Sequence, residues 1–259
     1  MRNPEKFEPR YEPEAKSEAE EVEEKERKEL ELIENSSLDL QDKIDLVLVY
    51  LKEKPAAWIG AGDRFYKTEK EKEKQKKLER LNQKGEEIKT ILEILGLPNH
   101  TFRYETEEEK TTLISYDSFV SQDSERLNRL REAWQNGRHE DIGLALGYPE
   151  SAVKGFIKGE VLDRVEAFKK LPKKDREELK KEEVFKFLTF GLSRNNWREE
   201  LELARKYQRA IREKSPKIYN EVIKSMRDPL TFRGKLSTKL ERILNRIEYF
   251  KRSLSEKKP

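Results

Sequence analysis

The fold class is decided by the stretch Thr101-Phe-Arg-Tyr-Glu-Thr106 and the stretch Thr111-Thr-Leu-Ile-Ser-Tyr116 that follows it. Both segments are rich in β-branched and aromatic residues and flank a glutamate-rich turn, which predicts a β-hairpin. A third short strand is predicted for Ala56-Ala57-Trp58-Ile59-Gly60, with a glycine-containing exit at Gly60 and Gly62. We therefore expect a small three-stranded sheet.

Amphipathic helices flank these strands in the sequence. Ser37 is suited to cap a helix that ends before Pro55, and a second apolar stripe begins at Glu86 and ends at Gly96. We expect both helices on one face of the sheet. Residues 67–84 are almost wholly charged and predict a solvated helix or a projecting hairpin arm. The predicted fold class is α+β, predominantly helical.

The chain after the hairpin predicts helices alone. Ser121 or Asp123 would cap a helix that ends at Asn136 and Gly137. Five further helices are expected to begin at Val161, Pro172, Ser193 or Asn195, Pro216 and Leu236. The first of them would cover residues 161–171 and the last residues 236–254. Their short connections indicate a helical bundle.

These elements divide the chain into predicted units. Residues 1–36 predict an acidic arm, disordered or exposed and helical, because they hold prolines and glutamates with a poor apolar stripe. Residues 37–120 form the α+β module, residues 121–170 a three-helix unit, and residues 171–254 a basic helical bundle. Residues 255–259 predict a disordered tail.

One segment of the helical part indicates a function. Residues 138–160 read RHEDIGLALGYPESAVKGFIKGE, in which Gly147 suits a tight turn and Pro149 suits the start of a second helix. The apolar seam of the two helices would consist of Ile142, Leu146, Val153 and Phe156. This pattern is typical of a helix-turn-helix unit, although any helical hairpin needs such a seam. We expect a β-branched residue at Gly147 to be costly and Gly143→Ala to be tolerated.

In the helix-turn-helix interpretation the second helix would enter a major groove of DNA. Ser151, Lys154 and Lys158 would then face the nucleic acid. The same face holds no Arg, Asn or Gln, the side chains on which reading of base edges relies most, so we expect weak sequence selectivity. The alternative interpretation is plain packing of a helical hairpin.

The same residues resemble a family signature. Leu146-Gly147-Tyr148-Pro149, followed by Val153, resembles the Leu-Gly-Tyr-Pro signature of an uncharacterised archaeal and bacterial family, and Lys54-Pro55-Ala56-Ala57 resembles another short segment of it. Members of that family tend to carry paired cysteines after the proline, where this chain has Ser151 and Ala152. The resemblance therefore implies no metal or thiol chemistry for this chain.

Charge is distributed unevenly along the sequence. The net charge of +3 combines residues 1–37, with 13 acidic and 7 basic side chains, and residues 205–259, with 17 basic and 6 acidic side chains. A basic end of this kind is typical of polyanion binding, and Lys239, Arg242 and Arg246 would neutralise phosphates there. The alternative is a solvated lysine-rich helix surface in a structural or protein-interaction protein. With 42% charged and 34% apolar residues, much of the chain must be solvated surface.

Catalytic chemistry has weaker signals. A cleft on the sheet could be lined by Arg103, Tyr104, Glu105, Tyr116 and Asp117, with His100 at its rim. Polar residues at every second position are also what a half-exposed strand requires. No spacing is typical of a metal site, a nucleophile elbow or a phosphate loop, so we predict no cofactor and no metal, and an enzyme is kept only as an alternative.

The sequence also leads to expectations about the location of the protein and its partners. No run of about 18 apolar residues predicts a membrane span, and no apolar segment predicts a secretory signal. The sequence has no cysteine, which fits a reducing compartment, and we expect a cytoplasmic protein. The predicted partners are DNA or RNA, or in the alternative another protein, with the oligomeric state left open.

Overall fold

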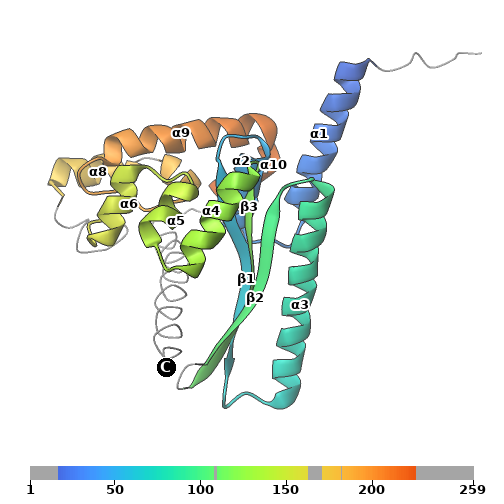
Figure 1. The fold of residues 1–259 in the computed structure, drawn as a ribbon. Helices are drawn as coiled ribbons and strands as arrows, with labels where there is room; N and C mark the ends of the chain where they lie inside the picture. The colour runs from blue at the N-terminus through green and yellow to red at the C-terminus, as the bar shows by residue number, and fades with distance from the viewer. Residues whose placement is uncertain (1–16, 108–109, 163–170, 182, 226–259) are drawn as a thin grey trace, which may run out of the picture.

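The computed structural model describes residues 17–107, 110–162, 171–181 and 183–225. Its strands are β1 (Ala56–Tyr66), β2 (Asn99–Glu107) and β3 (Thr111–Ser121). They form a three-stranded antiparallel sheet in the order β1-β3-β2, and helices cover it on two sides (Figure 1). The predicted α+β, predominantly helical fold is confirmed.

The strands are longer than the sequence pattern predicts. Strand β1 runs on to Tyr66, so the predicted glycine exit is wrong, and Gly60 and Gly62 lie inside the strand. Gly60 pairs with Asp117 of β3, and a Cβ atom at Gly60 would lie 2.2 Å from Asp117 Oδ1. The glycine is therefore needed for space beside a buried carboxylate and does not end the strand.

The two faces of the sheet pack differently. On one face Trp58 meets Phe119 and Trp134 edge to face, with ring centroids 5.2 Å and 4.7 Å apart, and Trp134 comes from α4 (Ser124–Gln135). On the other face Ala57 and Ile59 join the main apolar core with α2 (Leu40–Tyr50) and α3 (Glu71–Ile94). The expectation of two helices on one face is therefore met by α2 and α3. Such aromatic pairs add about 0.5–1.5 kcal/mol beyond area burial.

Two predicted helix boundaries are wrong. Asp39, not Ser37, is the N-cap residue of α2. Ser37 instead donates its backbone N–H to Glu87 Oε1 at 2.7 Å, and its hydroxyl also bonds to that carboxylate. The charged stretch after residue 70 and the helix expected at Glu86 form one continuous helix, α3. Gly85 lies within it and leaves space for the Tyr116 ring, since a Cβ there would lie 2.8 Å from Tyr116 Cγ.

The hairpin consists of α5 (His139–Ala145) and α6 (Glu150–Ile157). Gly147 in the turn has a φ of +79°, as predicted. Three of the four seam residues, Ile142, Leu146 and Val153, are buried, and Phe156 is half-buried. A Cβ at Gly143 would lie 2.8 Å from Val153 Cγ2, so the expected tolerance of Gly143→Ala is wrong: the helices are already in contact there.

The remaining helices are α8 (Lys173–Lys181), the 3₁₀ helix η1 (Glu183–Phe187), α9 (Trp197–Lys214) and α10 (Pro216–Ser225). The predicted start at Pro216 is confirmed. The helix expected from Pro172 is divided into α8 and η1. Val161 pairs with Ser193 in an isolated antiparallel bridge, while residues 163–170 and the predicted helix 236–254 lie outside the described residues.

The helix α1 (Glu18–Asn35) joins the two ends of the described chain. Ser17 and Glu20 form a capping box at its start. Near its end, buried Leu30 and Ile33 belong to a core cluster that reaches α10. Three polar contacts accompany this packing: Lys214 Nζ to Glu26 at 2.6 Å, Ser215 Oγ to Glu34 at 2.5 Å, and Lys217 Nζ to Asn35 at 2.5 Å. The predicted unit boundaries near residues 36, 120 and 170 stay a prediction.

A buried ion pair connects the sheet to the helical part. Lys54, between α2 and β1, is 1% exposed and donates from Nζ to Asp45 Oδ1 at 2.5 Å. The same Nζ lies 5.1 Å from the centre of the Tyr148 ring in the hairpin turn. Burial, with the charges of Asp45 and Glu53, raises the pKa of Tyr207 on α9. Lys54 belongs to one of the two segments that carry the family resemblance and lies against Tyr148 of the other.

We predict that Gly147→Ala and Gly96→Ala differ in their cost. Both glycines have positive φ, but a Cβ at Gly147 would lie 2.3 Å from Pro55 Cγ, whereas none lies within 4 Å at Gly96. Gly96→Ala should cost about 1–2 kcal/mol of unfolding free energy through strain alone, and Gly147→Ala about 3 kcal/mol or more. Gly143→Ala should cost on the order of 1 kcal/mol. Urea denaturation measures all three, and equal losses at Gly96 and Gly147 would contradict the contact with Pro55.

We also predict strong coupling between Lys54 and Asp45. Asp45→Ala leaves a buried ammonium without its carboxylate and should cost about 3–5 kcal/mol of unfolding free energy. The double variant Lys54→Met/Asp45→Leu should lose less than Asp45→Ala, because neither member of the pair then leaves its partner's charge buried and uncompensated. Losses that simply add in a double-mutant cycle would show that the two side chains do not interact.

Candidate nucleic-acid interface

The described candidates on α6 differ in their surroundings. Ser151 is half-buried and donates from Oγ to Glu200 Oε1 of α9 at 2.6 Å. Lys154 is exposed and forms an ion pair with Glu150 one turn earlier. Lys158, the C-cap residue, is exposed, and no ion pair to it is seen within the described part of the chain. Of the three, only Lys158 therefore offers a charge that no described acid already neutralises.

Glu200 explains why Ser151 is engaged. Its carboxylate, 2% exposed, accepts hydrogen bonds from Ser151 Oγ, Ser193 N and Ser193 Oγ, each at 2.6 Å. Gly155 packs on the same loop, since a Cβ there would lie 2.9 Å from Ser193 Cβ. One side of α6 is thus buried against the start of α9. Sequence reasoning missed Glu200, although its place among the buried residues Trp197, Leu201 and Ala204 on the apolar stripe of α9 was a usable signal.

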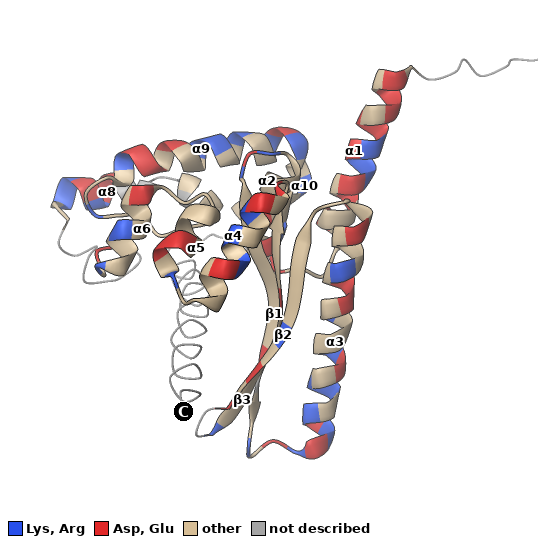
Figure 2. Cartoon of the chain, in the orientation of Figure 1, with Lys and Arg blue, Asp and Glu red and all other residues tan. Residues whose placement is uncertain are grey.

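The basic bundle is described only in part. Lys239, Arg242 and Arg246 lie outside the described residues. On α9, four cations form ion pairs with acids: Arg198 with Asp175 and Glu178, Arg205 with Glu202, Lys206 with Glu53, and Lys214 with Glu26. Figure 2 shows that basic and acidic residues are mixed along this helix. The described cations of α9 therefore do not form a bare basic face.

The register divides the predicted catalytic cleft between two faces of the sheet. Arg103 is paired with Tyr116, whose ring packs on Gly85 of α3. Asp117, the next residue, points to the opposite face and accepts a hydrogen bond from Trp58 Nε1 at 3.0 Å. His100 lies beside the Phe102 ring, and burial, with the charge of Arg131, lowers its pKa. These residues do not surround one cavity.

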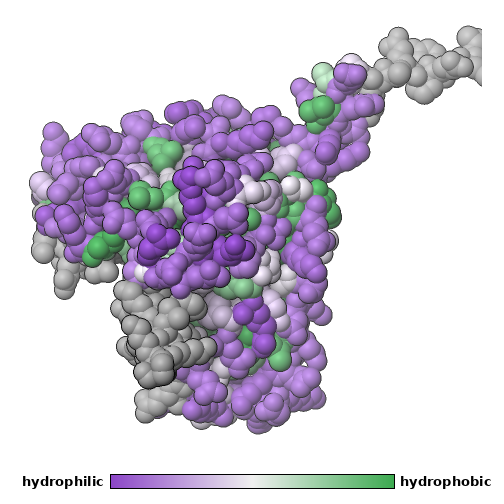
Figure 3. Space-filling model, viewed as in Figure 1, coloured by the Kyte–Doolittle hydropathy of each residue, from purple (hydrophilic) through white to green (hydrophobic). Residues whose placement is uncertain are grey.

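The described residues were also compared with what a metal site and a membrane-spanning helix require. Within residues 17–107, 110–162, 171–181 and 183–225, no three His, Cys, Asp or Glu side chains are grouped as a metal ion would require. None of the helices described is long and apolar enough to cross a membrane. In the view of Figure 3, hydrophobic side chains form small separate patches on a hydrophilic surface.

A pocket that sequence reasoning missed lies between α3 and β1. It has a volume of about 450 Å³ and is lined by residues 37–39, residues 60–63, and Lys77, Arg80, Leu81 and Lys84 of α3. Strand β1 is at the edge of the sheet. The pocket is therefore bordered by an edge strand, one helix face and the loop that precedes α2, and we name it the α3–β1 pocket.

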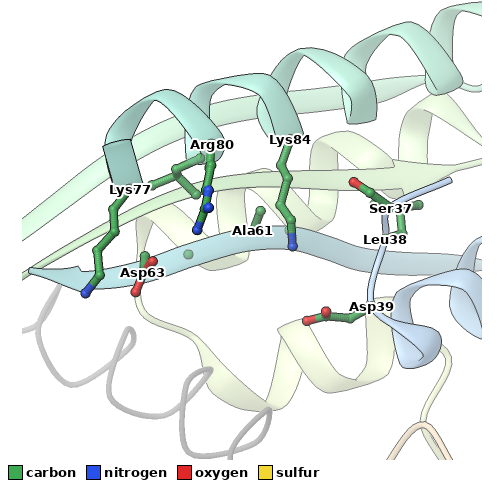
Figure 4. A pocket seen from close by; sticks show the side chains of 11 residues that line it. Ser37, Leu38, Asp39, Ala61, Asp63, Lys77, Arg80 and Lys84 are labelled. Atoms are coloured by element: carbon green, nitrogen blue, oxygen red, sulfur yellow. The ribbon is translucent and has the colours of Figure 1, made fainter. Parts of the chain in front are cut away.

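One wall of the α3–β1 pocket is cationic. Lys77, Arg80 and Lys84 follow a spacing of three and four residues, which places them on one face of α3 over a length of about 10 Å. Figure 4 shows their side chains extending from α3 toward β1. A hydrogen bond to Glu69, with the charge of Asp63, raises the pKa of Lys77, which favours its charged form. Arg80 and Lys84 are exposed, and within the described chain no ion pair to either is seen.

The opposite wall of the pocket is formed by small residues and by two carboxylates. Gly60 and Ala61 leave the backbone of β1 approachable, and the N–H of Gly60 donates to Asp42 Oδ2 at 3.2 Å. Asp63 and Asp39 line the pocket below the three cations (Figure 4). Asp39 is the N-cap residue of α2 but makes no side-chain capping bond. The pocket thus presents positive groups on the helix and negative groups on the strand and loop.

Comparisons with protein-family models, with curated proteins and with solved structures found no match to this chain. The resemblance to the Leu-Gly-Tyr-Pro family therefore stays a prediction.

We predict that Ser151→Ala acts on stability and leaves nucleic-acid affinity unchanged. The substitution removes one of the three hydrogen bonds to buried Glu200 and should lower the unfolding free energy by about 1–3 kcal/mol. Thermal denaturation measures the loss, and Thr90→Ala, which removes an exposed hydroxyl bond to the Glu86 carbonyl outside the pocket, is the control with a smaller expected effect. A selective loss of nucleic-acid affinity with unchanged stability would instead make Ser151 a contact residue.

Proposed function

We propose that the protein binds nucleic acid through phosphate contacts centred on the α3–β1 pocket. The observation that carries this proposal is the row formed by Lys77, Arg80 and Lys84, whose side chains extend to one pocket with a glycine-containing floor. Lys77 forms an ion pair with Glu69 at 2.6 Å, so Arg80 and Lys84 are the members of the row that no described acid pairs. Lys and Arg contacts to phosphates supply most sequence-independent affinity for nucleic acids. Selectivity among sequences would then be weak.

The hairpin has a supporting role in this proposal. Insertion of α6 into a major groove would use Ser151, but this hydroxyl is bonded to Glu200. Lys154 would first have to leave Glu150. Lys158 is the remaining α6 candidate, and we assign it a peripheral phosphate contact. The structural basis of the proposal is therefore α3 rather than the helix-turn-helix interpretation.

A protein-interaction role is the second candidate. The specific observation in its favour is the pairing of α9 cations with acids on other elements, as in Lys206 with Glu53 and Lys214 with Glu26. Exposed ion pairs of this kind keep a surface solvated and add at most about 1 kcal/mol each. Of the six cations on α9, Arg209 and Arg212 are those that form no ion pair within the described residues.

The test measures affinity for fluorescently labelled single-stranded DNA, RNA and duplex DNA by anisotropy across a salt series. The unchanged protein should bind at about 50 mM salt and lose affinity steeply as salt rises. Arg80→Ala/Lys84→Ala should remove two phosphate contacts and flatten the slope of log affinity against log salt by about 1.4 for single strands.

The matched control is Lys72→Ala/Lys89→Ala, which removes two exposed cations from α3 on sides away from the pocket. It should change the slope much less, although the net charge falls equally. Equal slopes for the two double variants would remove the α3–β1 pocket from the proposal. A protein that binds no nucleic acid at about 50 mM salt would overturn the proposal and leave the protein-interaction role as the remaining candidate.

A further inference from the structure

We infer that the α3–β1 pocket holds one nucleotide of a single strand, with the phosphate on Arg80 and Lys84 and an amino-bearing base against Asp39. This inference depends on the proposed function and specifies the ligand class of the same site. Three features support it: the size of the pocket, its two oppositely charged walls, and an exposed aromatic ring beside Lys77.

The size of the pocket favours a single strand. Its volume of about 450 Å³ lies in the range of sites for small molecules, about 300–1,000 Å³. A double helix, whose major groove alone is about 12 Å wide, presents its bases paired and inward and could reach such a pocket only with its outer phosphates. An unpaired nucleotide can enter with both phosphate and base.

The two walls of the pocket suit the two ends of a nucleotide. Arg80 and Lys84 offer donors and positive charge to a phosphate, as cations generally do. Asp39 on the opposite side can only accept hydrogen bonds when ionised, and Figure 4 shows its carboxylate below the cation row. Carboxylates in nucleic-acid sites accept from the exocyclic amine of cytosine. The acids on this wall therefore favour bases with an amino group over thymine or uracil, which have none.

Asp39 is suited to this role because α2 does not use its side chain. It occupies the N-cap position, yet it makes no side-chain bond to the helix. Helix N-caps normally use their oxygen for such a bond. The backbone of Asp39 thus stays within α2 while its carboxylate remains available to the pocket.

Tyr66 extends the site beyond one nucleotide. It ends β1, is 48% exposed, and its ring centre lies 5.9 Å from Lys77 Nζ. Exposed aromatic rings beside cations are the usual stacking platforms for unpaired bases. A strand that leaves the pocket along the cation row would place its next base near this ring.

The experiment compares labelled dC and dT oligonucleotides of equal length with the full chain at one salt concentration. The unchanged protein should bind dC more tightly, by about fivefold, the lower end expected for one base contact. Asp39→Ala should abolish this ratio. Loss of a negative charge raises both affinities, so Glu79→Ala, an exposed acid on α3 outside the pocket lining, is the control that should raise both and keep the ratio. Tyr66→Ala should weaken both oligonucleotides.

The outcomes separate this inference from the proposed function. An equal affinity for dC and dT, or a ratio that Asp39→Ala leaves unchanged, overturns the base contact while the Arg80/Lys84 salt effect still supports phosphate binding. Displacement of the oligonucleotide by cytidine 5′-monophosphate at an equal nucleotide concentration overturns the single strand in favour of a free nucleotide. Tighter binding of duplex than of single strands also overturns it, and failure of the Arg80/Lys84 variant to weaken any binding overturns both proposals.

Discussion

The buried ion pair of Lys54 and Asp45 is the constraint on which the arrangement of the chain depends. The Lys54 ammonium group contacts Asp45 of α2 and the ring of Tyr148 in the hairpin turn. The charge of the Asp45 carboxylate also contributes to the raised pKa of Tyr207 on α9. A buried charge is stable only while its partner stays in place, so these elements cannot shift independently. Only Pro55 separates Lys54 from β1, and the pair therefore fixes where the strand starts and which of its residues border the α3–β1 pocket.

The difference between α3 and α9 comes from the placement of acids and not from the number of cations. On α9, acids of α8, α1 and the residues before β1 reach the basic side chains. In residues 74–84 of α3 there are five Lys or Arg and one Glu. The facing strand β1 contributes Gly60, Gly62 and Asp63 to the opposite side of the pocket. Within the described residues, Lys77, Arg80 and Lys84 thus lie on one face of α3, and of these three only Lys77 is paired with an acid, Glu69.

Local signals account for what the sequence predicted correctly. The β-branched residues of 101–116, the glycine at position 147 and the proline at position 216 each restrict the backbone within a few residues. The length of β1 was missed because Gly60 and Gly62 are held extended by pairing with β3, more than fifty residues later in the chain. The pocket was missed for the same reason: it forms where residues 37–39 meet α3, and apolar periodicity does not report such a contact. Glu200 shows the converse case, a polar residue on an apolar stripe whose partners, Ser151 and Ser193, come from other segments.

The contacts between α1 and the residues around α10 have a consequence for synthesis of the chain. Glu26, Glu34 and Asn35 bond to residues that are synthesised 188, 181 and 182 positions later in the chain. At about 5–20 residues per second, a ribosome needs roughly 10–40 s to supply them. During this interval Leu30 and Ile33 have no completed core to enter. The dense charge of α1, which contributes little to the folded core, then opposes association between neighbouring nascent chains.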